Sequence, residues 1–114
     1  MEVKGDDYSV TFCPATATVL CEGTLRLLGS EGYEKIVSLL DTVAKKRLPA
    51  ITLDMKNLKF LNSSGINVFS KFVIAVRNQN NSRLTLLGSS RFPWQSNSLR
   101  NMKRLMPDLI LEIE

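Results

Sequence analysis

Two different spacings of hydrophobic residues alternate along this 114-residue chain. Runs in which every second residue is apolar indicate half-buried strands, whereas apolar residues three and four positions apart indicate helices. Runs of β type predict five strands, at residues 8–12, 16–22, 50–55, 83–88 and 109–113. Helical segments lie between the later strands, and this alternation is typical of an α/β fold with a mostly parallel sheet.

Three helices are predicted between these strands. The first begins near Ser30, whose hydroxyl can accept hydrogen bonds from free backbone amides, and it ends before Pro49. The second follows Asn62-Ser63-Ser64 and is apolar around most of its circumference, so we expect it to be largely buried. The third begins at Pro93, or at one of the serines that follow, and ends before Pro107.

The predicted order of elements is ββαβαβαβ. Only Pro14-Ala15 joins the first two strands, a connection short enough for an antiparallel hairpin. We expect a mixed, mostly parallel sheet with the helices mainly on one face. No linker, internal repeat or low-complexity tract interrupts the sequence, so residues 1–114 should form one domain, with residues 1–7 as a flexible N-terminus.

The sequence contains no histidine, and this absence excludes many catalytic mechanisms. Histidine is the commonest general base, the usual activator of serine and cysteine nucleophiles, and the commonest metal ligand. The two cysteines, Cys13 and Cys21, are too few for a disulfide framework or a four-ligand zinc site. No glycine-rich phosphate-binding motif occurs either. We therefore expect a protein that is not an enzyme and that uses no metal or cofactor.

The hydropathy of the chain bears on its location. No stretch approaches the roughly 18 uncharged apolar residues that a membrane span needs. The N-terminal residues have no apolar run behind a basic start, so they resemble neither a secretory signal nor a transit peptide. We therefore expect a cytoplasmic protein without a transmembrane segment.

Charge is distributed unevenly along the sequence. Between Asp54 and Asp108 there is no acidic residue, and the basic residues there are Lys56, Lys59, Lys71, Arg77, Arg83, Arg91, Arg100, Lys103 and Arg104. Three of these, Arg100, Lys103 and Arg104, form one stripe of the third predicted helix. Such a surface could attract nucleic acid, an anionic membrane or an acidic protein face, or be merely solvated. Because no known nucleic-acid-binding motif accompanies it, we do not expect nucleic acid as the main partner.

The segment Asn62-Ser63-Ser64-Gly65 is the best candidate for a functional site. It joins a strand to the second predicted helix, and open α/β sheets place their sites in such loops. Either serine hydroxyl or the Asn62 amide can cap the helix, and Gly65 allows another backbone to approach closely. A plain helix cap and a partner-binding site are both compatible with this pattern. A phosphoryl group here would bring about two negative charges to the positive end of the helix dipole.

Three pieces of the sequence carry a family resemblance. Residues 19–25 read VLCEGTL, residues 53–66 contain a strand, a loop and the Asn62 to Gly65 segment, and residues 84–88 read LTLLG. In this order and spacing they resemble the L-x-G-x-L, D-S-S-G and L-x-L-x-G/N stretches of the STAS family. Bacterial anti-sigma factor antagonists and sulphate transporter tails share this domain. The resemblance extends over residues 8–113 and implies the STAS fold.

The resemblance also implies a regulatory function. In antagonists of this family, the first serine of the signature is phosphorylated by a kinase that is also an anti-sigma factor, and Ser63 matches that serine. Unphosphorylated antagonist binds the kinase, and phosphate weakens the contact. Asn62 and Arg26 stand where the family often carries acids, and Arg26 could pair with a phosphate on Ser63.

The predicted partner is therefore a protein, either such a kinase or a larger signalling complex. Ser63 is the predicted phosphoacceptor, ahead of Ser64. The predicted partner-binding residues are Arg26, Asn62, Ser63, Ser64, Gly65 and Asn67. The insert at residues 89–95 departs from the shorter connection expected in the family. Phe92 and Trp94 within it either cover the core or form an exposed anchor for a partner.

Overall fold

In the computed structural model, which describes residues 1–114, six strands form one mixed sheet in the order β1-β2-β3-β4-β5-β6. The strands are β1 (Glu2–Lys4), β2 (Tyr8–Cys13), β3 (Thr18–Leu25), β4 (Ala50–Leu61), β5 (Arg83–Gly88) and β6 (Ile110–Ile113). The helices are α1 (Gly29–Gly32), α2 (Glu34–Lys45), α3 (Ser63–Gln79) and α4 (Pro93–Leu105).

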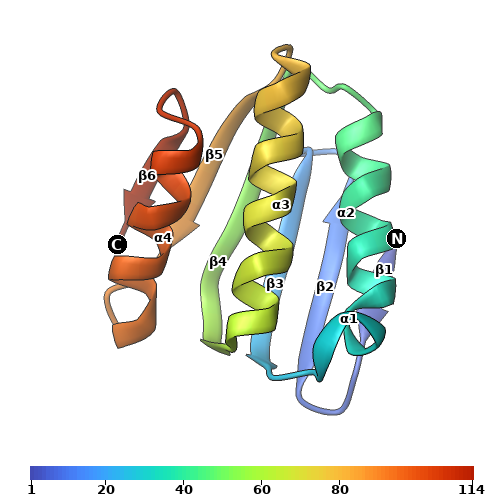
Figure 1. The fold of residues 1–114 in the computed structure, drawn as a ribbon, viewed down its shortest axis with the longest axis vertical. Helices are drawn as coiled ribbons and strands as arrows, with labels where there is room; N and C mark the ends of the chain where they lie inside the picture. The colour runs from blue at the N-terminus through green and yellow to red at the C-terminus, as the bar shows by residue number, and fades with distance from the viewer.

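The order of the strands explains why the helices share one face of the sheet. β1, β2 and β3 pair antiparallel, whereas β3, β4, β5 and β6 pair parallel. A helical crossover joins each parallel pair, and such crossovers are almost always right-handed. Because each new strand is added on the same side, equal handedness puts α2, α3 and α4 on one face (Figure 1). The predicted α/β class, N-terminal hairpin and one-sided helices are confirmed.

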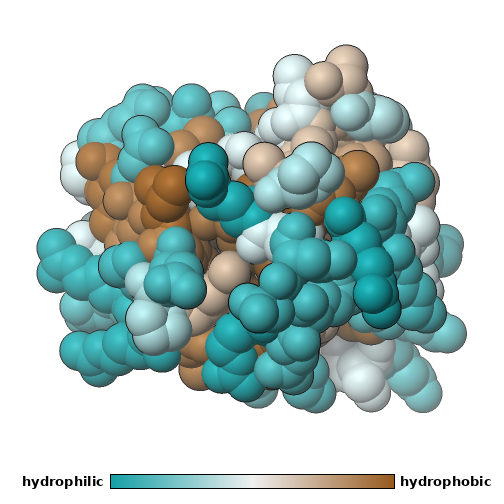
Figure 2. All heavy atoms as spheres, turned by 90° about the horizontal axis from the view of Figure 1, so that it is seen from above, coloured by the Kyte–Doolittle hydropathy of each residue, from teal (hydrophilic) through white to brown (hydrophobic).

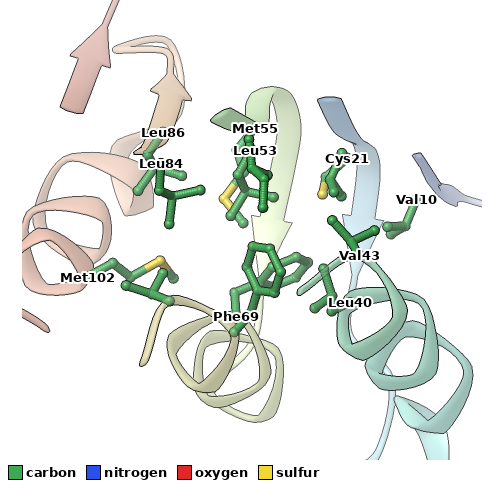
Figure 3. Packing of buried hydrophobic residues seen from close by; sticks show 14 of the residues in the cluster. Val10, Cys21, Leu40, Val43, Leu53, Met55, Phe69, Leu84, Leu86 and Met102 are labelled. Carbon is green, nitrogen blue, oxygen red and sulfur yellow. The ribbon is translucent and has the colours of Figure 1, made fainter. Parts of the chain in front are cut away.

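One hydrophobic core of 26 buried residues fills the space between the sheet and the helices. Figure 3 shows Leu40, Phe69 and Met102 pointing from three helices toward Leu53 and Leu84 on the sheet. All five side chains are nearly or fully buried. The helices are thereby fixed to the sheet by burial of apolar surface, which is the main favourable term in folding.

β4 is longer than the sequence pattern predicted, with 12 residues instead of residues 50–55. Its pairing with β3 shifts register twice, between Leu20 and Glu22 and between Gly23 and Thr24. At each shift β4 contains one extra residue, as in a β-bulge. The buried positions are therefore 51, 53 and 55, and then 58 and 61. This broken alternation concealed the second half of the strand.

The N-terminus and the first helix differ from expectation. Residues 1–7, expected to be flexible, include β1, which pairs with β2 at the edge of the sheet. The expected cap at Ser30 is wrong, because α1 begins after Leu28 and no side chain caps it. The helical segment is also divided at Tyr33 into the short α1 and the longer α2.

α3 is less buried than the sequence predicted. Its buried residues face the sheet and are Gly65, Phe69, Phe72, Val73 and Val76. Ile66 and Ile74 lie outside this buried stripe and are only half-buried. None of the helices combines the length and hydrophobicity that crossing a membrane requires. Figure 2, which looks along the sheet, shows hydrophilic residues over much of the surface with apolar atoms between them.

Candidate functional site

The carboxyl ends of β3 and β4 lie side by side, and the segments that follow them meet at the start of α3. Leu25 pairs with Leu61 at the last position of the ladder. The backbone N–H of Asn62 then donates to the Leu25 carbonyl at 3.1 Å. The loop at residues 26–28 and the first turn of α3 therefore form one surface, at the edge of the sheet where the parallel strands end (Figure 1).

Asn62 fixes this surface through its side-chain amide. Its Oδ1 accepts from the Gly65 N–H at 2.9 Å and so caps α3. The same oxygen accepts from the Tyr33 hydroxyl at 2.7 Å, and Nδ2 donates to the Leu27 carbonyl at 2.8 Å. One amide thus joins the β3 loop, the start of α2 and the start of α3. The sequence left the cap open between Asn62 and the two serines, and it did not predict the contacts with Tyr33 and Leu27.

Tyr33 holds the site from the core side. Its side chain is fully buried, and its hydroxyl reaches Asn62 from the break between α1 and α2. Burial raises the pKa of this hydroxyl, because the phenolate would lose its hydration in the core. The group therefore stays protonated and remains a hydrogen-bond donor. In the sequence, Tyr33 shows only the three- and four-residue apolar spacing that indicates a helix.

Gly65 is required by close packing. A Cβ at this position would lie 2.6 Å from the Tyr33 hydroxyl and would overlap the Leu61 side chain. The expectation that another backbone approaches Gly65 is wrong, since the neighbours are two side chains. Any larger residue would push Tyr33 away from Asn62. The glycine thereby keeps α3 close to the end of β4.

Neither serine of the signature caps the helix. Ser63 is exposed and Ser64 is half-buried, and neither hydroxyl makes a hydrogen bond within the chain. Asn62 alone supplies the cap, so the two serines have no role in closing the helix. The hydroxyl of Ser63 faces solvent at the positive end of a 17-residue helix, where backbone N–H groups of the first turn are free.

Two exposed hydrophobic side chains, Leu28 and Phe60, belong to the segments that meet at the start of α3, and sequence reasoning missed both. Leu28 is 85% exposed and Phe60 is 43% exposed, and only four large hydrophobic residues of the chain are exposed at all. The guanidinium of Arg26 lies 5.8 Å from the centre of the Phe60 ring, within the range of a cation–π contact. We call Arg26, Leu28, Phe60 and Ser63 the α3-start surface. No local pattern in the sequence could have revealed this surface, because the exposure of Leu28 and Phe60 depends on which elements lie over them.

The other predicted residues lie at different distances from this surface. Asn67 is exposed one turn after Ser63 on the same side of α3. Arg100, Lys103 and Arg104 belong to α4 and do not join the start of α3. Lys103 is turned back, with its Nζ donating to the Pro107 and Leu109 carbonyls at 3.1 and 2.6 Å. No group of three or more cysteine, aspartate or glutamate side chains could hold a metal ion.

The insert covers the part of β4 that β5 does not reach. β5 pairs with β4 only as far as Asp54, which leaves later carbonyls of β4 without a strand beside them. The fully buried Gln95 donates from Nε2 to the carbonyls of Met55 and Leu58, at 2.7 and 3.0 Å. Trp94 donates from Nε1 to the Leu58 carbonyl at 3.1 Å and packs on the core. Of the two alternatives for Trp94, the structure shows the core cover.

These features define a class of protein: the chain has a STAS-like fold, as its sequence resemblance predicted. A one-sided sheet carries a serine-containing helix start at the carboxyl end of β4, where the family signature lies. No family profile matches the chain, and no curated protein sequence matches it. The likeness of this chain to known proteins is therefore one of fold, shown by solved structures.

Three solved structures resemble the chain over nearly its whole length. SiaC of Pseudomonas aeruginosa aligns with a TM-score of 0.77 and 12% identity, covering 100% of this chain and 96% of SiaC. A chain in the complex of the diguanylate cyclase SiaD with its activator SiaC, from the same organism, aligns at 0.75 and 10%, covering 100% and 99%. The Bacillus cell fate determinant SpoIIAA, in its phosphorylated form, aligns at 0.58 and 17%, covering 91% and 89%.

Proposed function

We propose that this chain is a regulatory, protein-binding module that contacts its partner through the α3-start surface. The observation that carries the proposal is the exposed Ser63, at a helix start that Asn62 fixes to the neighbouring segments, which also expose Leu28 and Phe60. Exposed apolar side chains beside a polar helix end are typical of the anchors of a protein interface.

The rigidity of this surface favours binding. Asn62 ties together three segments, and Gly65 and Tyr33 pack tightly beneath them. A surface that is already ordered loses little conformational freedom when a partner binds. Contacts at Leu28 and Phe60 would therefore contribute to affinity with a small entropic cost.

Likeness to the solved structures supports a regulatory role. SiaC is described as the activator of a diguanylate cyclase and forms a complex with it. SpoIIAA is a cell fate determinant with a phosphorylated form. By this analogy the partner of the present chain is a protein, such as a serine kinase that is also an anti-sigma factor, or a larger signalling complex.

Phosphorylation at Ser63 is the finer part of the proposal. The Ser63 hydroxyl is exposed and takes no part in the helix cap, so a kinase could modify it without breaking a hydrogen bond. The added phosphate would be stabilised by the helix N-terminus and would change the charge of the α3-start surface. Asn62 brings no negative charge to this position, and Arg26 lies in the adjoining loop.

A non-enzymatic role is supported by the chemistry around Ser63. A serine nucleophile needs an adjacent base, and no side chain accepts a hydrogen bond from this hydroxyl. The chain also lacks histidine, which most often supplies that base.

Binding experiments with matched variants test the proposal. We expect Ser63→Ala to retain partner proteins that Ser63→Asp loses, because the carboxylate imitates part of the phosphate charge. Leu28→Ser should weaken capture by about tenfold, as loss of an interface anchor does. Ser38→Asp, on the exposed side of α2, and Ile110→Ser, on β6, serve as controls for charge and for hydrophobicity. Equal capture of the same partners by all five proteins would contradict the proposal.

A further inference from the structure

We propose that the groove between α3 and α4 binds an acidic amphipathic helix of the partner protein. This inference rests on the proposed function, since the helix would belong to the protein that the α3-start surface contacts. To the proposed function it adds a second surface that contacts the partner. It also specifies that this surface binds a helix and that the helix is negatively charged.

The groove is a hollow of about 500 Å³ between two neighbouring helices. Its lining residues are Ile66, Asn67, Ser70, Lys71 and Ile74 of α3 and Ser98, Asn101 and Leu105 of α4. Ile66, Ile74 and Leu105 are half-buried and leave part of their apolar surface open to solvent. The groove therefore has apolar positions that a partner could cover.

Small side chains at the centre explain why the groove exists. Ser70 and Ser98 stand where larger apolar residues would close the contact between α3 and α4. Each helix is fixed to the sheet by its own buried residues, such as Phe69 and Leu99, so the helices cannot collapse onto one another. From Ile66 to Ile74 the helix rises by about 12 Å, which matches two turns of a bound helix. Side chains of a partner helix can enter such a groove at i and i+4 spacing.

The charge around the groove selects an acidic occupant. Lys71 lines the groove, and Arg104 lies beside it, with Nη1 3.4 Å from Asn101 Oδ1. Both ion pairs of the chain involve Lys56, so neither Lys71 nor Arg104 is neutralised by a carboxylate. No acidic residue occurs anywhere between Asp54 and Asp108, the stretch that contains both helices. Complementary charge would steer an acidic helix toward this groove.

Ser63 lies on the same side of α3 as residues that line the groove. Ser63, Asn67, Ser70 and Ile74 follow one another at spacings of three and four residues and so share one side of α3. A helix in the groove would therefore extend toward Ser63. A phosphate on Ser63 would place negative charge at the end of the groove. It would therefore repel the acidic helix that the groove binds. The groove thereby supplies a physical reason why phosphorylation would release the partner.

Peptide selection with no assumed partner sequence tests the inference. The probe is a phage-displayed library of helical peptides with apolar residues at i, i+4 and i+7 and with Glu, Gln or Lys allowed on both flanks. Selection on the wild-type chain is followed by counter-selection on Ser70→Arg, in which a long side chain fills the groove. We expect enrichment of Glu at the flanking positions. The peptides should bind the Lys71→Glu/Arg104→Glu variant at least about tenfold more weakly in fluorescence anisotropy.

The same anisotropy measurement includes a control for charge at a distant surface. Lys35→Glu/Lys45→Glu reverses two exposed charges on α2 and should leave peptide affinity unchanged. Thermal melts of each variant show whether it is folded. Ser70→Arg fills the groove but adds a positive charge, so weaker binding of an acidic peptide to it cannot come from lost charge attraction. Neutral or basic flanks in the selected peptides would overturn the inference. Binding to both groove variants as tight as to the wild-type chain, or selective binding of a short single-stranded DNA run in parallel, would also overturn it.

The two proposals can fail separately. If Ser63→Asp and Leu28→Ser reduce partner capture but the groove variants do not, the α3-start surface binds the partner and the groove does not. If acidic peptides bind the groove but the Ser63 and Leu28 variants capture partners normally, the proposed function fails at the α3-start surface. If both hold, Ser63→Asp should also weaken the acidic peptides, because its carboxylate lies toward the end of the groove.

Discussion

At the scale of single residues, Asn62 has a chemical role that an aspartate could not fill. Its amide accepts two hydrogen bonds on one atom and donates one from the other. A carboxylate could accept from Gly65 and Tyr33, but it has no hydrogen to donate to the Leu27 carbonyl. Asparagine at position 62 is therefore favoured over aspartate by the neighbouring Leu27 carbonyl. The sequence alone does not identify this hydrogen-bond acceptor.

We expect Asn62→Asp to lower the free energy of unfolding by about 1–2 kcal/mol, because a carboxylate oxygen would face the Leu27 carbonyl oxygen. The helix dipole offsets part of this loss. Urea denaturation measures the difference, and Asn97→Asp, at an exposed position near the start of α4, is the matched control. A stability of Asn62→Asp equal to that of wild type would show that the Leu27 contact contributes nothing.

At the scale of elements, the insert before α4 completes the sheet without adding a strand. β4 continues beyond the end of its pairing with β5, and its carbonyls at Met55 and Leu58 need donors. Gln95 supplies them from α4, and its Oε1 accepts from the Ser89 N–H at 2.7 Å. This brace holds the second half of β4, which leads to Asn62, against α4.

We expect Gln95→Leu to lower the free energy of unfolding by about 2–4 kcal/mol, because it leaves the Ser89 N–H and the Met55 carbonyl buried without partners. Ser96→Ala, the neighbouring change on the same helix, should have little effect because the Ser96 hydroxyl makes no hydrogen bond. Thermal unfolding followed by circular dichroism distinguishes the two variants. If they melt at the same temperature, the brace does not stabilise the fold.

At the scale of the whole molecule, a single core holds one layer of helices on one sheet, and this core contains two ionisable groups. Burial raises the pKa of the Cys21 thiol, and the carboxylates of Asp54 and Glu22 raise it further. Burial likewise raises the pKa of Tyr33. Both groups are held in the neutral, protonated form by the folded core.

Alkaline solution should therefore destabilise the chain. A group whose pKa is higher in the folded than in the unfolded state contributes stability below the unfolded pKa and loses it as pH rises toward the folded pKa. We expect the free energy of unfolding to fall above about pH 8.5 because of Cys21, and more steeply above about pH 10 because of Tyr33, by up to about 1.4 kcal/mol per pH unit for each group. Urea titrations under reducing conditions measure this slope. Cys21→Ala should reduce it, whereas Cys13→Ala, which removes the half-exposed thiol, should not.

The sequence by itself determined the class of fold and the place of the helix start. Hydrophobic spacing depends only on neighbours along the chain, so it predicted the hairpin, the parallel strands and the helices on one face. Asn62 was among the three candidate caps because capping is also local, whereas Ser63 was singled out by the family resemblance. The extension of β4 was missed because two bulges break its alternation.

Only the tertiary structure decided how the site is assembled. Tyr33 and Asn62 are 29 residues apart, and Leu27 and Asn62 are 35 apart, so no local pattern joins them. Leu28 and Phe60 are exposed because no other element covers them. One side of α3 and the groove beside it are open for the same reason. A sequence records which residues are apolar, but burial is a property of the space around them. Which apolar residues are buried is therefore decided only when the sheet and the helices pack together.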